Sequence, residues 1–169
     1  MKRNSGFSLI ELLIVVAVIM IIAAIAIPNL LRARIAANEA SAANSIRKIS
    51  TAEYSYSTAY PTVGYAAQLT DLGGALPCLP SQTSACMLDN VLSSGNKSGY
   101  QFVALGFTQG GGSTNSAYVA GSAPQSYNVT GVRNFCMISD GVLRSLNPAG
   151  GGTPPASTVA QCLLYPTTQ

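Results

Sequence analysis

The sequence predicts an α+β fold in which one long N-terminal helix packs on a small antiparallel β-sheet. Three observations predict it. Residues 7–31 are almost wholly apolar, the stretch after them keeps a helical spacing of apolar residues, and strand-like segments begin only at residue 100. A helix and a sheet that each carry one apolar face bury those faces against each other in small domains.

The predicted helix has two halves with different surroundings. Residues 7–31 are long enough to cross the ~30 Å apolar core of a bilayer. Residues 32–60 form an amphipathic half, because apolar side chains recur there at spacings of three, four or seven. Tyr60-Pro61 is expected to end the helix, since the residue before a proline avoids helical geometry. The apolar stripe of the second half is formed by Ile35, Ala42, Ile46, Ile49, Tyr56 and Tyr60.

Residues 61–169 are expected to form the globular part of the protein. Glycines and prolines break residues 61–98 into an irregular connecting region. Residues 99–169 should hold a sheet of three or four strands. In its last hairpin, Asp140-Gly141 favours a tight two-residue connection. The predicted strands are Tyr100–Phe107, Ala117–Ala120, Phe135–Ser139 and Val142–Leu146.

Composition argues against an enzyme. The chain has no histidine, which removes Ser-His and Cys-His nucleophiles and histidine acid–base catalysis. Its six acids are scattered, and neither a cofactor nor a metal is expected, because C-x2-C spacing is absent as well. The net charge is only +3, and no basic stripe indicates a nucleic-acid site.

The first eleven residues combine features that do not suit an ordinary secretory signal. Lys2 and Arg3 precede Gly6, so the small residue stands before the apolar run rather than after it. A cut after Gly6 would discard a basic leader and leave a new amino group on Phe7. That amine is a natural partner for Glu11, a carboxylate that is otherwise costly in an apolar segment. The amine could belong to the same chain or to an adjacent copy, and the adjacent copy better explains why the charge is retained.

These residues resemble the processing signal of type IV pilins and of the related type II secretion pseudopilins, a class III prepilin signal. The resemblance is close over about the first 55 residues and only architectural beyond them. It implies the pilin fold, a leader of residues 1–6, cleavage between Gly6 and Phe7, and N-methylation of Phe7. It also implies a filament core built from residues 7–31, with Glu11 acting in assembly and Pro28 matching the family's helix-kinking proline. The motif is Gly6-Phe7-Ser8-Leu9-Ile10-Glu11-Leu12-Leu13.

Four cysteines lie in the exported part, and an even number outside the cytoplasm indicates two disulfides. Three pairings exist, of which Cys78–Cys86 with Cys136–Cys162 is favoured. The first bond would staple the connecting region. The second would fasten the C-terminal tail to a strand, as the resemblance to pilins also implies.

The resemblance implies a structural function: the major subunit of a type IV pilus. Its partners would be further copies of itself in a helical homopolymer, a prepilin peptidase, the inner-membrane assembly machinery and an outer-membrane secretin. The precursor would reside in the inner membrane and the product in an extracellular filament. A pseudopilin of a type II secretion system is the alternative, and a plain signal anchor or a membrane-anchored binding module are others. The sequence does not choose among motility, adhesion, DNA uptake and conduction, nor does it settle glycosylation or major against minor subunit.

Overall fold

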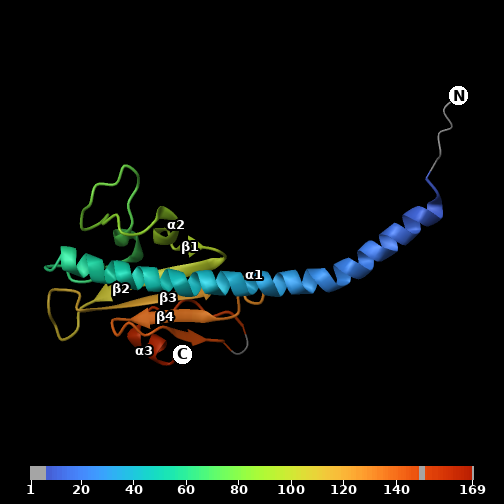
Figure 1. The fold of residues 1–169 in the computed structure, drawn as a ribbon. Coiled ribbons are helices and arrows are strands. Elements are labelled where there is room, and N and C mark those ends of the chain that lie inside the picture. Colours follow the sequence, from blue (N-terminus) through green and yellow to red (C-terminus); the bar gives the residue numbers. More distant parts are fainter. Residues whose placement is uncertain (1–6, 149–150, 169) are drawn as a thin grey trace. The chain divides into compact units, whose positions relative to one another are not determined.

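The computed structural model describes residues 7–148 and 151–168, whose course is drawn in Figure 1. The chain forms two compact units, one ending at Arg34 and the other beginning at Ile35. The second unit is called the head below. In chain order the elements are α1 (Leu9–Ala59), η1 (Leu69–Leu72), α2 (Asn90–Ser93), β1 (Asn96–Lys97), β2 (Tyr100–Phe107), β3 (Ala117–Pro124), β4 (Asn134–Ile138), β5 (Arg144–Leu146) and α3 (Val159–Leu163).

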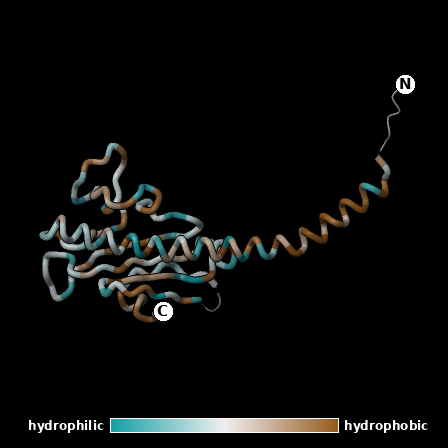
Figure 2. Tube along the Cα trace, viewed as in Figure 1, coloured by the Kyte–Doolittle hydropathy of each residue, from teal (hydrophilic) through white to brown (hydrophobic). Residues whose placement is uncertain are grey.

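The described part of the first unit is the start of α1, and it is apolar on all sides. No side chain between residues 7 and 31 is buried within the chain, and Ile25 and Ile27 are each 66% exposed. Figure 2 shows this stretch as an almost continuous hydrophobic tube. It is long and apolar enough to cross a membrane. A helix that is hydrophobic all round is a membrane span or the core of something larger.

Within the head, α1 becomes amphipathic and buries one stripe. Ala42, Ile46 and Ile49 are fully buried and Tyr56 is 1% exposed, as their helical spacing predicted. The helix ends at Ala59, where Tyr60 still donates its backbone N–H to the carbonyl of Tyr56 at 2.8 Å. The predicted stop at Tyr60-Pro61 is therefore confirmed.

The sheet is a meander of five antiparallel strands in the order β1-β2-β3-β4-β5. β2 has the predicted bounds, but β3 continues to Pro124 and a short extra strand, β1, pairs with the start of β2. The prediction of three or four strands was therefore one or two strands short. The two-residue hairpin at Asp140-Gly141 was also wrong, because β4 ends at Ile138 and β5 begins only at Arg144.

The two faces of the sheet carry separate hydrophobic clusters. Residues alternate between faces along a strand, so Tyr118 and Ala120 of β3 join the cluster under α1 whereas Val119 joins the opposite one. The C-terminal segment with α3 covers that opposite face. Gly121 permits this close packing, because a Cβ there would lie 2.2 Å from the carbonyl oxygen of Ala156.

Two disulfides secure the parts of the head that lack regular structure. Cys78 is bonded to Cys86, and Cys136 of β4 is bonded to Cys162 of α3, which is the pairing favoured from the sequence. Backbone bonds add to the first link: the N–H of Ala85 reaches the carbonyl of Asp71 at 2.7 Å. The connecting region is therefore irregular in shape but fixed to its surroundings.

Candidate processing and assembly site

The start of α1 forms half of a capping box around Glu11. The Oε2 atom of Glu11 accepts a hydrogen bond from the backbone N–H of Ser8 at 2.9 Å, and the helix begins one residue later, at Leu9. The first N–H groups of a helix have no partner within it, and a carboxylate three residues after the cap supplies one. The same carboxylate also lies where the helix dipole favours negative charge. The pattern Ser8-Leu9-Ile10-Glu11 carried this signal in the sequence, and the sequence analysis missed it.

Only one of the two carboxylate oxygens of Glu11 is used within the described residues. Its Oε1 atom makes no hydrogen bond there, and the side chain is exposed. Phe7 is 81% exposed. Gly6, the other residue of the predicted cleavage junction, lies outside the described residues. The exposed Phe7 and the half-satisfied carboxylate of Glu11 leave room for a second hydrogen-bond donor.

Pro28 lies inside α1. Because proline has no backbone N–H, the carbonyl of Ala24 receives no helical bond from this position. Membrane helices tolerate such a gap more readily than helices in water do. The helix therefore lacks one backbone hydrogen bond within its apolar half.

The carboxylates of the head are engaged in structural bonds. Glu39 is 7% exposed, and its Oε1 accepts from the backbone N–H groups of Val132 and Arg133 at 3.0 and 3.1 Å. Its Oε2 accepts from Nε and Nη2 of Arg133, each at 2.8 Å. The guanidinium of Arg133 also lies 5.6 Å from the ring centroid of Phe135. Glu39 thus fastens α1 to the start of β4.

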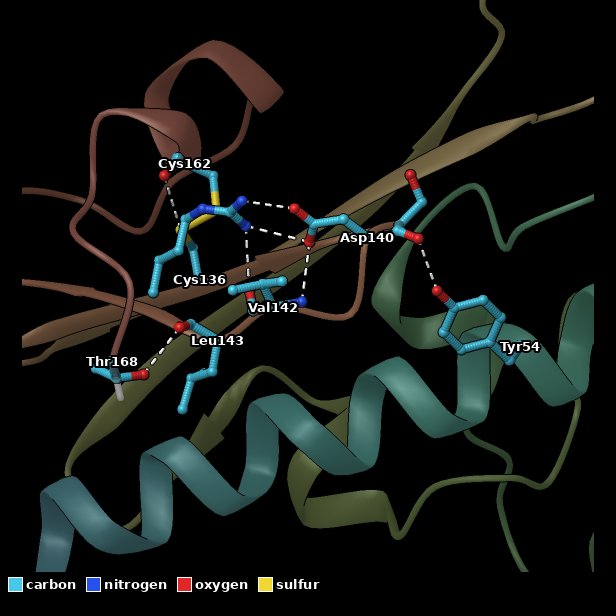
Figure 3. A network of polar contacts seen from close by, with 9 residues as sticks. Tyr54, Cys136, Asp140, Val142, Leu143, Cys162 and Thr168 are labelled. Atoms are coloured by element: carbon cyan, nitrogen blue, oxygen red, sulfur yellow. Dashed lines mark hydrogen bonds and ion pairs between the residues drawn. A yellow bond between two sulfur atoms is a disulfide. The ribbon is translucent and has the colours of Figure 1, made fainter.

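Asp140 organises the connection between β4 and β5, which Figure 3 shows from close by. Its carboxylate accepts from the backbone N–H of Val142 at 2.9 Å and from the guanidinium of Arg144. The Arg144 hydrogen bond is the main reason that the pKa of Asp140 lies below its ordinary value. These bonds hold a connection longer than the one predicted. In the same view, Tyr54 donates to the carbonyl of Ser139 at 2.7 Å.

Glu53 is the buried carboxyl group of the head core. It is 0% exposed, its Oε2 accepts from the backbone N–H of Ala66 at 2.9 Å, and its Oε1 has no partner among the described residues. Burial, opposed by the Ala66 bond and assisted by the charge of Asp71, raises the pKa of Glu53 from 4.5 to about 8. Glu53 is therefore mainly protonated at neutral pH.

None of these groups forms a catalytic or metal-binding arrangement. Within the described ranges, no three His, Cys, Asp or Glu side chains are placed to hold a metal ion. The acids of the head serve separate elements, and the four cysteines are consumed by disulfides.

Comparison with known proteins points to the same end of the chain. Residues 1–27 match the family described as the prokaryotic N-terminal methylation motif. The chain is 46% identical over 54 residues to the type IV major pilin protein PilA of Myxococcus xanthus, an alignment that covers 32% of this chain and 24% of the relative. It is 62% identical over 39 residues to the type IV wide pilus major component PilA4 of Thermus thermophilus, covering 23% of this chain and 30% of the relative. No solved structure matches the chain significantly.

The fold and the N-terminal segment define a class of proteins: an all-round apolar helix continues into a head where it packs on an antiparallel sheet. The methylation motif and the two relatives narrow this class to proteins that resemble type IV pilus subunits. The chain carries the N-terminal methylation motif and is similar, over 54 and 39 residues, to two type IV pilus proteins. The alignments span less than a third of either relative.

Proposed function

We propose that this chain is the major, filament-forming subunit of a type IV pilus. The observation that carries the proposal is the pairing of an all-round apolar helix with one half-satisfied carboxylate near its start. A side chain such as Ile25, 66% exposed in the single copy, needs lipid before assembly and neighbouring helices after it. The family match over residues 1–27 supports the same role.

The precursor enters the inner membrane with Lys2 and Arg3 on the cytoplasmic side, as basic flanks favour. A prepilin peptidase then cuts between Gly6 and Phe7 and methylates the new amine of Phe7. The exposed Phe7 side chain, 81% accessible, is consistent with an accessible junction. Only the mature chain, without its basic leader, moves into the filament.

Glu11 has two tasks in this scheme. Its Oε2 keeps the first helical turn ordered through the N–H of Ser8. Its Oε1 meets the Phe7 amine of an adjacent copy. Exchange of lipid for neighbouring helices is nearly neutral for apolar side chains, because both surroundings are apolar. The ionic contact therefore supplies direction and register to the assembly.

The pilus assembly machinery of the inner membrane and an outer-membrane secretin would complete the export path. The product is an extracellular filament on the bacterial surface. The two disulfides of the head suit an oxidising location of this kind. Motility, adhesion and DNA uptake are all compatible with such a filament.

Two substitutions at Glu11 test the proposal in cells that carry the assembly machinery. Glu11→Ala removes both tasks, whereas Glu11→Gln keeps an acceptor for the Ser8 N–H and removes the charge. We expect both variants to insert and to be cleaved, with mass analysis showing a methylated N-terminus at Phe7. Both should yield little sheared surface filament.

A Glu11→Gln variant that assembles like the unaltered chain would leave only the capping task and contradict the ionic contact. A mature protein that begins at Met1 would contradict processing and favour a membrane-anchored binding module. Protein confined to the periplasm, with no surface filament, would support the pseudopilin alternative.

A further inference from the structure

The two disulfides of the head differ in how far their sulfur atoms are open to solvent. Cys136 and Cys162 are 0% exposed and belong to the cluster on the sheet face that α3 covers. Cys78 and Cys86 are only half-buried. Thiol–disulfide exchange needs a thiolate to reach one of the two bonded sulfur atoms. Of the two bonds, Cys78–Cys86 is therefore the one that a thiolate can reach in the folded head.

A surface hollow opens at this accessible bond. It has a volume of about 300 Å³, and both cysteines line it together with Leu76 and Leu88. Gly74 also lines the hollow and leaves room for the sulfur atoms, because an added Cβ there would overlap Sγ of Cys78 and lie 3.3 Å from Sγ of Cys86. A small thiol has space to approach the bond from this hollow.

The surroundings of the bond do not repel an incoming thiolate. Residues 72–88 contain no Asp, Glu, Lys or Arg. The acid that lines the hollow, Asp89, is paired with Lys97 at 3.2 Å. The nearest charged groups therefore compensate each other, and the attacking anion meets a neutral surface.

Ser84 lies where a released sulfur atom needs a hydrogen-bond donor. Its Oγ atom is 4.0 Å from Sγ of Cys78, and its hydrogen bond to the carbonyl of Gly73 is long, at 3.5 Å. A hydroxyl held this loosely can turn to donate to a thiolate on Cys78, and hydrogen bonds to charged acceptors are stronger than those to neutral ones. Cys78 is therefore favoured as the leaving sulfur.

The loop that this bond closes can open without unfolding the head. The backbone N–H groups of Ala85 and Met87 donate to carbonyls within η1 at 2.7 and 2.8 Å, and these bonds do not involve sulfur. Cys86 between them has a φ of +60°, which is unfavourable for residues other than glycine. Reduction removes one restraint on that conformation. It should therefore release residues 75–84 and leave the base of the loop and the sheet in place.

We propose that the Cys78–Cys86 bond is a site of thiol–disulfide exchange with a dithiol, and that the Cys136–Cys162 bond is not. The attacking thiolate bonds to Sγ of Cys86, the Sγ–Sγ bond breaks, and its electron pair leaves on Sγ of Cys78, which takes a proton. The second thiol of the reductant then attacks the mixed disulfide and releases Cys86 as a thiol. Two electrons and two protons pass to the head, and the dithiol becomes a disulfide. This reaction does not depend on the proposed function.

Partial reduction of the folded, full-length chain in detergent tests the site. The chain is treated with dithiothreitol near neutral pH and quenched at intervals, and its free cysteines are alkylated and located by peptide mass analysis. We expect the Cys78–Cys86 bond to open at least about a hundredfold faster than the Cys136–Cys162 bond, because buried sulfur reacts only after local opening. Equal rates, or faster opening of Cys136–Cys162, overturn the proposal. Loss of the tyrosine circular dichroism near 280 nm along with the first bond contradicts a local release.

A matched pair of serines in the loop tests the donor. Ser84→Ala should slow reduction of the Cys78–Cys86 bond about threefold, because the leaving thiolate loses its hydrogen bond. Ser81→Ala changes the same loop at an exposed position and should leave the rate where it was. An unchanged rate in Ser84→Ala, or equal slowing in both variants, contradicts the part given to the Ser84 hydroxyl.

A second reductant separates two sources of the thiolate, a small dithiol and a protein with a Cys-x-x-Cys dithiol, for which thioredoxin is the probe. Leu76 and Leu79 flank Cys78 in the sequence and are 85% and 83% exposed, so a protein would contact them. Replacing both by serine should then slow thioredoxin several-fold and leave dithiothreitol unaffected. Equal rates with both reductants assign the site to small thiols. No reaction of the Cys78–Cys86 bond with either reductant overturns the site.

Discussion

The two units of this chain differ in whether their apolar side chains are buried within the chain. In the first unit, side chains such as Ile19 and Ile25 are 59% and 66% exposed and find no cover within the chain. In the head, Ile46 and Ile49 of the same helix are fully buried. Each unit also holds one carboxyl group in apolar surroundings. Glu11 is exposed in the single copy, whereas Glu53 is enclosed.

The difference shows where each unit obtains its stability. The head encloses its own core, so its free energy of unfolding should depend on its own residues and on the protonation of Glu53. The apolar side chains of the first unit find no cover within the chain, so any stabilising contact they make must come from outside it. The same change of residue should therefore affect folding in one unit and assembly in the other.

The largest expected effect concerns the pH dependence of the head. The pKa of Glu53 is raised from 4.5 to about 8 in the folded head, chiefly by burial. The folded state therefore holds this proton more tightly than the unfolded state does. Stability is fully present below about pH 4.5 and is lost as pH rises towards 8, by up to about 5 kcal/mol.

Urea unfolding of the full chain in detergent, followed between these pH values, measures this loss. Glu53→Gln cannot ionise, so the decline should be much smaller in that variant. An equal decline in both proteins would show that another group is responsible.

A matched pair of isoleucines on α1 tests the comparison itself. Ile49→Ala removes buried methyl groups from the head core and should lower its free energy of unfolding by about 3–4 kcal/mol. Ile25→Ala changes an exposed side chain of the first unit and should leave the unfolding midpoint of the head where it was. Thermal unfolding can be followed by the circular dichroism of the tyrosines near 280 nm. Because every tyrosine lies in the head, this signal reports the head alone. A fall of the same size in both variants would contradict the independence of the two units.

The two disulfides should differ modestly in strength. Cys136 and Cys162 are 26 residues apart, so replacing both by serine should cost about 3–4 kcal/mol by loop closure. Cys78 and Cys86 are 8 residues apart, and their loss should cost about 2–3 kcal/mol. Denaturant midpoints of the two double-serine variants give the comparison. A larger loss for the Cys78–Cys86 pair would mean that strain or packing outweighs loop length.

The smallest expected effect is at the ion pair between Lys97 and Asp89, joined at 3.2 Å. Both side chains remain partly exposed, at 25% and 49%, so water screens their attraction. Lys97→Met should lower the free energy of unfolding by no more than about 0.5 kcal/mol. A double-mutant cycle with Asp89→Asn isolates the pair, and a coupling several times larger would show that this edge of the sheet depends on charge.

Sequence patterns predicted the long helix and the strand β2 closely, because each has a sustained period. The stripe from Ala42 to Tyr56 repeats as a helix does, and Pro61 marks its end. Tyr100–Phe107 is a long run without a breaker except Gly106, and the structure gives it those same bounds.

The rest of the head depends on contacts that a local pattern does not carry. β1 consists of Asn96–Lys97, polar residues that become a strand only by pairing with β2. α3 has five residues, and its cap at Thr158 and its disulfide stabilise a helix too short to be stable by propensity. At the candidate site, the Ser8–Glu11 cap was visible in the sequence as Ser followed three residues later by Glu.

Glu39 joins α1 to the start of β4 through four donors on Val132 and Arg133. It is the first buried residue of α1 in the head. A pulling force on the helix from its N-terminal side would reach this carboxylate before it reached Ala42 or Ile46. Pulling the helix away from the head must then break several hydrogen bonds at the same time rather than one after another. This joint should therefore resist a pulling force better than a row of bonds that break in sequence.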